Sequence, residues 1–283
     1  MLKSSRECEL SRIFYFLIPL AFLLFVKANA GIAITPKFIF TNQSKSSAVI
    51  NVSNNGEAEE EVWVDFVFGY VISDDSGRIK VYIDSSNTDE LSITPFLQAY
   101  PKRFILGPGE SQTIRISVKS PTEKLDGEYW SRILVNSKPR KVITAVNDTL
   151  RVRSGLSFIT QQSIPFHYRK GNVSTGVSIS DLVGNVKDSL LIISMKLTRV
   201  GNAAFWGTRN VKVFNENGKL ISSIQKNLVV YKTLTQIDNI RLQDLPPGRY
   251  TVQVECVTTR TDIKKIEIVP ALMSRESVSV TIP

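Results

Sequence analysis

The chain has 283 residues, a formal net charge of +9 and a single histidine, His167. One histidine excludes a metal site built from a histidine pair and an acid–base mechanism that needs two imidazoles. The positive charge could attract nucleic acid, but the basic residues are spread along the chain without an interleaved aromatic strip, so nucleic-acid binding is not expected.

Residues 1–30 have the composition of a secretory signal peptide. Basic residues precede an apolar run at residues 13–26, and Ala28-Asn29-Ala30 places small residues at both positions that determine cleavage. A membrane anchor is the alternative, but a run of this length is short for a bilayer span. We therefore expect an exported chain that loses this segment, and no stable membrane insertion after cleavage.

The cysteine content predicts a mature protein without an intrachain disulfide. Cys8 lies in the predicted signal peptide, which leaves Cys256 alone. Cys256 alternates with Val252 and Val254 on one face of a predicted strand, a pattern that favours a buried thiol acting as a small hydrophobic residue. Burial of apolar surface must therefore hold the fold together.

Residues 31–170 are predicted to form a first domain of short strands. Apolar and polar residues alternate most clearly at residues 112–118, as in a half-buried strand. Turn sequences such as Gly107-Pro108-Gly109 separate the strands. No segment has helical periodicity, so we predict an all-β, immunoglobulin-like sandwich. Its other strands are expected at residues 32–40, 48–53, 62–68, 79–83, 103–106 and 129–135.

The end of this domain contains a long polar segment followed by a strand. Residues 136–153 are polar and basic and include Pro139, which predicts a long hairpin loop. Apolar alternation resumes at Leu156 and Phe158 and continues to the end of the domain near Gly171. From the residues alone, these side chains could pack inside their own sandwich or be offered to another protein.

Residues 171–283 are predicted to form a second immunoglobulin- or fibronectin-like sandwich, joined to the first at an angle by a short connector. Leu190-Leu191-Ile192-Ile193 is typical of a buried strand, and Pro246-Pro247-Gly248 turns into another. Further strands are expected at residues 210–214, 219–224, 249–257, 262–269 and 277–282. The cleft between the two domains is the default binding site.

One group of motifs resembles a known family. Pro101 and the run FILGPGESQTIR at residues 104–115 are followed by Asp126-Gly127-Glu128-Tyr129-Trp130. Together they resemble the N-terminal domain of PapD-like periplasmic chaperones of pilus and fimbria assembly, over residues 32–169. The resemblance implies a periplasmic, Gram-negative type protein that is not an enzyme and uses no cofactor or metal. Such a chaperone lends its own last strand to an exported subunit with an incomplete sandwich (donor-strand complementation) and passes it to an outer-membrane usher.

The resemblance also implies roles for individual residues. Leu156, Phe158 and Thr160 correspond to the donated strand. Lys37 falls at a basic position that binds the carboxylate terminus of the subunit. The second basic position of that anchor falls at Pro165, which cannot serve, so Arg169 is a possible substitute or the anchor is absent.

Glu128 and Arg169 match an ion pair between the two domains. Two other functions stay open: a structural or adhesive component of a surface assembly, and a hydrolase or carbohydrate-binding module on the same folds. A groove in the first sandwich would favour the former, and two converging carboxylates in the cleft the latter.

Overall fold

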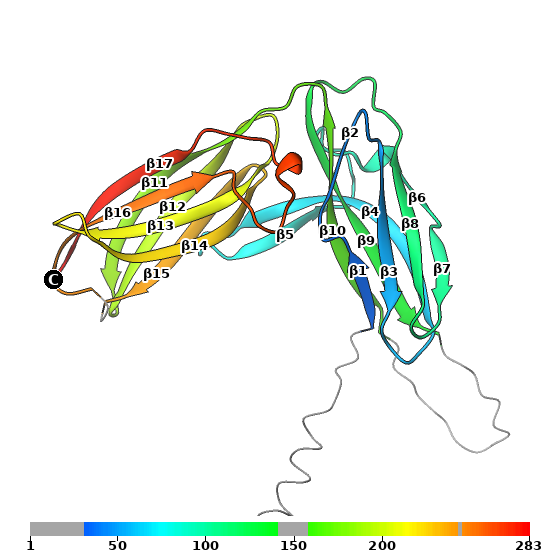
Figure 1. Cartoon of the computed structure of the whole chain (residues 1–283), viewed down its shortest axis with the longest axis horizontal. Helices are drawn as coiled ribbons and strands as arrows, with labels where there is room; N and C mark the ends of the chain where they lie inside the picture. The colour runs from blue at the N-terminus through cyan, green and yellow to red at the C-terminus, as the bar shows by residue number, and fades with distance from the viewer. Residues whose placement is uncertain (1–30, 141–157, 243–244) are drawn as a thin grey trace, which may run out of the picture.

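The computed structural model describes residues 31–140, 158–242 and 245–283. Two β-sandwiches meet at an angle (Figure 1), which confirms the predicted all-β fold class. The described elements are strands apart from short 3-10 turns such as η1 (Thr94–Phe96) and η3 (Lys265–Glu267). The predicted signal peptide lies outside the described residues. No helix among the described residues is long and apolar enough to span a membrane.

The first sandwich pairs a four-stranded sheet with a six-stranded sheet. The order of strands in the smaller sheet is β1 (Ile32–Thr35), β3 (Ser47–Asn54), β8 (Ser111–Val118) and β6 (Leu97–Tyr100). The larger sheet runs β2 (Ile39–Asn42), β10 (Thr160–Lys170), β9 (Gly127–Pro139), β4 (Glu60–Ser73) and β5 (Ile79–Asp84), with β7 (Arg103–Leu106) also pairing with β4. The chain crosses between the sheets at Pro36, which cannot donate to a ladder.

Alternation in the sequence explains the core of this sandwich. Ile114 and Ile116 of β8 are fully buried on the same face of the sheet as Ile50 and Val52 of the neighbouring β3, while the residues between them are exposed or half-buried. On the other sheet, Ile164, Phe166 and Tyr168 of β10 close the same core. The period of two therefore places one face of each strand inside, as the sequence predicts.

The second sandwich pairs a three-stranded with a four-stranded sheet. The sheets are ordered β11 (Thr175–Lys187), β12 (Leu190–Gly201), β15 (Thr233–Arg241), and β14 (Leu220–Val230), β13 (Phe205–Asn215), β16 (Gly248–Val257), β17 (Ser274–Ile282). Cys256 is a free, fully buried thiol in its core, as predicted, and burial raises its pKa to about 12. Arg209 is also buried there and forms an ion pair with Asp238.

Three sequence predictions are wrong in detail. The 136–153 segment does not begin as a loop, because β9 continues to Pro139. The polar Asn136 is accommodated in the sheet because its side-chain amide donates to Asp65 and accepts from Gln161. Phe158 precedes β10 and has no strand assignment. By register it would lie opposite Pro139, which has no N–H to extend the ladder.

The third error concerns residues 262–269, which form a loop with η3 and no strand. Ile263 and Ile268 are buried in this loop, but they pack into an aromatic cluster at the junction of the sandwiches. Their apolar character therefore reflects packing between the sandwiches and not a position in a sheet.

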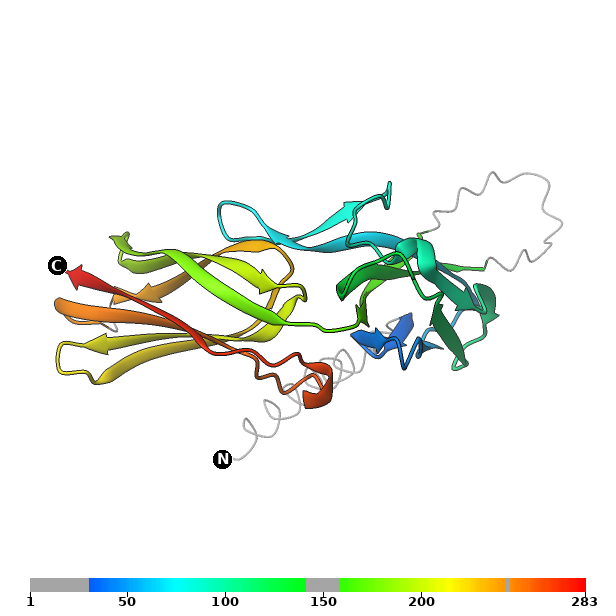
Figure 2. The ribbon, with the colours of Figure 1, turned by 90° about the horizontal axis from the view of Figure 1, so that it is seen from above.

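A hairpin of the first sandwich reaches the second. Strands β4 and β5 extend past the rest of their sheet and lie over β15 (Figure 2). The backbone N–H of Thr235 donates to Ser73 Oγ at 2.6 Å, and Lys232 Nζ lies 3.1 Å from Asp89 Oδ2. These contacts join the two sandwiches at a second place besides the connecting chain.

Candidate functional site

The most distinctive backbone feature is the open edge at the start of β10. On one side, β10 pairs with β9 along its whole length, from Thr160 to Lys170. On the other side, β2 pairs only with residues 166–169. Among the described residues, no strand pairs with residues 160–165 on this side; the Gln162 side chain donates to Ile32 O, a single side-chain contact. An open strand edge offers N–H and C=O groups to another chain.

The side chains before this edge are exposed. Phe158 is 73% exposed and Ile159 is 62% exposed, and Thr160, the first residue of β10, is also exposed. Counting back by two from the buried Ile164 passes through Thr160 to Phe158, so these residues would share a face if the strand continued. Leu156, the other residue predicted for the donated strand, lies outside the described residues.

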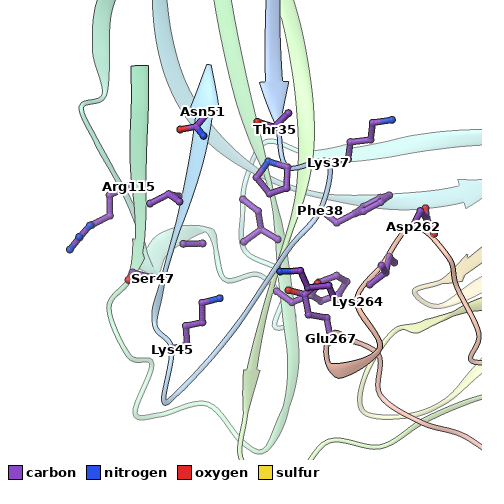
Figure 3. Close-up of a pocket in the computed structure, with 16 residues that line it drawn as sticks. Thr35, Lys37, Phe38, Lys45, Ser47, Asn51, Arg115, Asp262, Lys264 and Glu267 are labelled. Atoms are coloured by element: carbon purple, nitrogen blue, oxygen red, sulfur yellow. The ribbon is translucent and has the colours of Figure 1, made fainter. Parts of the chain in front are cut away.

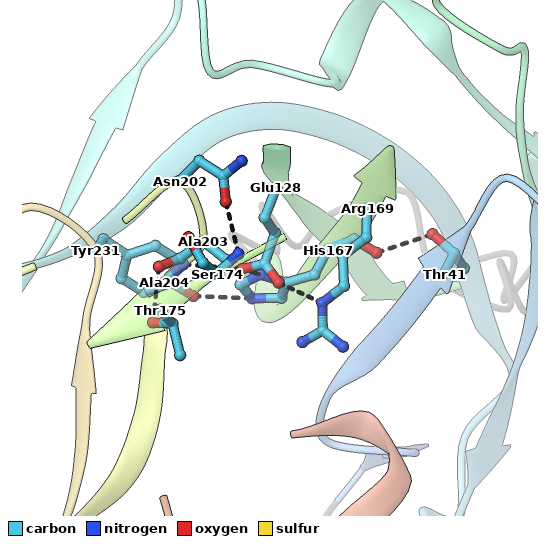
Figure 4. Close-up of polar contacts among 10 residues, drawn as sticks. All are labelled: Thr41, Glu128, His167, Arg169, Ser174, Thr175, Asn202, Ala203, Ala204 and Tyr231. Carbon is cyan, nitrogen blue, oxygen red and sulfur yellow. Dashed lines mark hydrogen bonds and ion pairs between the residues drawn. The ribbon is translucent and has the colours of Figure 1, made fainter. Parts of the chain in front are cut away.

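Glu128 and Arg169 are brought together at the junction of the sandwiches (Figure 4). Arg169 Nε donates to Glu128 Oε2 at 2.6 Å, and His167 Nδ1 lies 3.0 Å from Oε1. The N–H of Ala204, from the second sandwich, also reaches Glu128 Oε1. Full burial by itself raises the pKa of Glu128, but the charges and hydrogen bonds of His167 and Arg169 outweigh burial and hold that pKa below its usual value.

An aromatic cluster surrounds this pair. The His167 ring stacks between Phe40 at 5.1 Å and Tyr231 at 5.5 Å, and its Nε2 lies 3.1 Å from the Tyr231 hydroxyl. Trp206 packs edge-on against Phe40 and against His167. Burial raises the pKa of Tyr231, so its hydroxyl stays neutral. Tyr231 and Trp206 belong to the second sandwich, and Phe40 and His167 belong to the first. The cluster is therefore a third core, shared by both sandwiches, and it fixes the angle between them.

No local sequence pattern brings His167, Tyr231 and Trp206 together at the junction of the sandwiches. The one available signal was the position of His167, two residues before Arg169 on a strand whose alternate residues share a face. Tyr231 lies at the turn between β14 and β15, and no local pattern connects it to His167.

Lys37 lies elsewhere, at the rim of a hollow of about 780 Å³ between the sandwiches (Figure 3). Its basic lining comes from both sides: Lys37, Lys45 and Arg115 belong to the first sandwich and Lys264 to the second. Asp262 and Glu267 are the acidic lining residues. Lys37 is exposed, so it can meet an anion that enters the hollow.

Arg169 does not line this hollow, but it contacts a residue that does. Its guanidinium stacks over the Phe40 ring at 5.0 Å, and Phe40 is one of the lining residues. Arg169 Nη2 is buried and has no hydrogen-bond partner among the described residues. The structure therefore places Lys37 at the hollow, brings Arg169 to Glu128, and connects Arg169 to the hollow only through Phe40.

The chain is similar to solved structures of fimbrial chaperones. The class 5 fimbriae chaperone CfaA is 14% identical, with a TM-score of 0.43 over 89% of this chain and 100% of that one. The CupB2 chaperone of Pseudomonas aeruginosa is 9% identical, with a TM-score of 0.46 over 89% and 100%. A chain from the CsuC–CsuE chaperone–tip adhesion subunit pre-assembly complex of Acinetobacter baumannii is 11% identical, with a TM-score of 0.44 over 88% and 98%. No family model and no curated protein matches the chain. The chaperones are the class of protein that the sequence motifs resemble.

Proposed function

We propose that this protein is a periplasmic chaperone of pilus or fimbria assembly, with domains at residues 31–170 and 171–283. It captures an exported subunit whose sandwich lacks a strand and hands it to an outer-membrane usher, without catalysis. The open edge of β10 at residues 160–165 is the observation that supports this proposal. A subunit strand that pairs there extends the six-stranded sheet by β-augmentation.

In this proposal, exposed residues at and before the start of β10 determine which subunit is bound. When the subunit adds its strand, Leu156, Phe158 and Thr160 enter its open groove on alternate positions. Full burial of one large apolar side chain is worth about 1.5–3 kcal/mol, so Leu156 and Phe158 together supply about 3–6 kcal/mol before the cost of ordering the segment. The 73% exposure of Phe158 means that this gain is still available in the free chain.

The basic hollow supports a second contact in the same proposal. A chain terminus that enters beside Lys37 carries a carboxylate, and the excess of basic over acidic lining residues favours an anion there. Arg169 supports the wall through Phe40 and its pair with Glu128. In this arrangement Lys37 is the contacting cation, and Arg169 positions the cleft.

The decisive experiment compares two neighbouring exposed residues. Phe158→Ser, alone and with Leu156→Ser, should abolish co-purification of a co-expressed subunit encoded beside this gene, whereas Ile159→Ser should leave recovery within about twofold of wild type. Both positions are exposed in the free chain, so neither change should alter its thermal unfolding. Equal recovery with all variants would refute strand donation at these positions.

A further inference from the structure

Strand β5 is a second open edge, remote in sequence from β10. Within the described part of the chain, β4 is its only partner. Five consecutive residues are exposed, from Ile79 to Ile83, and the fractions reach 53% for Ile79 and 48% for Val81. The strand has no proline and no bulge in its register with β4, so two of the devices that block pairing at a sheet edge are absent from it; Lys80 is its one cation, and it is paired with Asp74 of the same hairpin at 3.0 Å.

The hydrogen-bond pattern fixes which residues face outward along this edge. Asp74 N donates to Arg78 O at 3.0 Å, so this pair closes the hairpin. In an antiparallel ladder, hydrogen-bonded pairs recur at every second residue, so residues 80 and 82 direct their N–H and C=O groups to β4. Ile79, Val81 and Ile83 therefore direct theirs to the free side.

The sequence of this edge is complementary to itself. A two-fold axis through Val81 places Ile79 opposite Ile83 of a second copy, and both residues direct their backbone N–H and C=O groups toward that copy. On the other face, Arg78 then lies opposite Asp84, and Lys80 lies opposite Tyr82. The Arg78 side chain is 78% exposed; its Nε lies 3.4 Å from Asp74, and the guanidinium has further N–H donors for a second carboxylate.

From these observations we infer that β5 pairs antiparallel with β5 of a second copy of this chain, in the register that places Val81 opposite Val81. The two six-stranded sheets become one continuous sheet across the dimer. Cross-strand apolar pairs and opposite charges stabilise this register, and a shift by one residue would place Ile79 opposite Tyr82 or Asp84.

Contacts within the chain fix the conformation of the β4–β5 hairpin before a second copy binds. Ile83 Cδ1 lies 2.8 Å from the position of a Cβ at Gly69, so this side chain packs over a glycine of β4. The tip is fixed by the second sandwich, where Thr235 N donates to Ser73. A six-residue edge buries a small area, so the dimer belongs to the weak, concentration-dependent class. The inference does not depend on the proposed function, since β10 is not part of this edge.

The register is tested with two variants of equal polarity. Ile79→Lys with Ile83→Lys places like charges opposite each other at both pairs, whereas Ile79→Lys with Ile83→Glu places opposite charges there. Sedimentation velocity of the full exported chain over a concentration series should show reversible dimers for the wild type. The dissociation constant should be roughly tenfold or more higher for the Lys/Lys variant than for the Lys/Glu variant.

The controls separate this edge from the others. Phe158→Ser should leave dimerisation unchanged, and both β5 variants should keep the thermal unfolding midpoint of the wild type within a few degrees, because their positions are exposed. A wild-type chain that stays monomeric at every concentration overturns the inference. This holds also if β5 of that monomer is found to bind a different protein. Equal dissociation constants for the two charged variants overturn it as well.

Discussion

At the scale of single residues, Glu128 is the most constrained charge at the junction. It is completely buried, yet it has three partners: Arg169, His167 and the backbone of Ala204. A buried carboxylate without such partners would be strongly disfavoured. The aromatic cluster around the pair shields it from water. The pair orients the two sandwiches, and the stability of the folded protein therefore also depends on the negative charge of Glu128.

Replacing this charge should destabilise the protein strongly. Glu128→Gln keeps the shape but leaves Arg169 and His167 without a carboxylate, and removing one partner of a buried pair costs roughly 3–5 kcal/mol. Glu255→Gln is the matched control, because Glu255 is also buried but is paired with Lys212 and Arg275, whose side chains are 33% and 50% exposed to solvent. Urea unfolding should show a much smaller loss for Glu255→Gln; equal losses would contradict the role assigned to the junction.

The same residue predicts a pH dependence. The folded-state pKa of Glu128 lies below its ordinary value, so the unfolded chain binds the proton at higher pH than the folded chain does. The stability that this residue supplies is complete above the unfolded pKa of about 4.3 and is lost as the pH falls through the folded-state pKa. The difference in unfolding free energy between wild type and Glu128→Gln should therefore shrink as the pH falls below about 4.3, the ordinary pKa of a glutamate.

At the scale of elements, the hairpin β4–β5 connects the sandwiches through its tip. Gly77 has a φ of +74°, and a Cβ there would lie 2.9 Å from Ile237 N in β15. Gly109 has nearly the same φ, +76°, with nothing within 4 Å. Alanine at either position has the same conformational cost, roughly 1–2 kcal/mol, but only Gly77→Ala adds a collision with the second sandwich.

This pair of glycines gives a local test of the docking. Gly77→Ala should accelerate hydrogen exchange of the Thr235 amide, which donates to Ser73 Oγ, because the tip must move away from β15. Gly109→Ala should leave that exchange rate unchanged while lowering the overall stability. Similar rates at Thr235 in both variants would mean that the tip does not rest on the second sandwich.

The elements also show how far sequence patterns carry the prediction. Alternation located β8 and the sandwich class, because a half-buried strand repeats every two residues. It misassigned residues 262–269, whose buried Ile263 and Ile268 pack against aromatic residues from other strands. The Glu128–Arg169 pair was accessible only through the family resemblance, and the aromatic cluster around it depends on residues that are distant in sequence, such as Phe40 and Tyr231.

At the scale of the whole molecule, the angle between the sandwiches is set by packing and not by the connector alone. Trp206 of the second sandwich is 3% exposed and contacts Phe38 and Phe40 of the first at ring distances of 5.2 and 5.3 Å. Ile263 and Ile268 complete the same cluster. Because the basic hollow has walls from both sandwiches, its shape depends on this cluster.

Trp206→Ala should therefore loosen the angle without unfolding either sandwich. The matched control is Leu197→Ala, because Leu197 is fully buried in the core of the second sandwich alone and its loss costs a comparable amount, about 2–5 kcal/mol. Spin labels at the exposed positions Thr113 and Glu216 report the distance between the sandwiches by electron spin resonance. The distance distribution should broaden for Trp206→Ala and stay as narrow as in the wild type for Leu197→Ala. Equal broadening in both variants would mean that global destabilisation, and not the shared aromatic cluster, controls the angle.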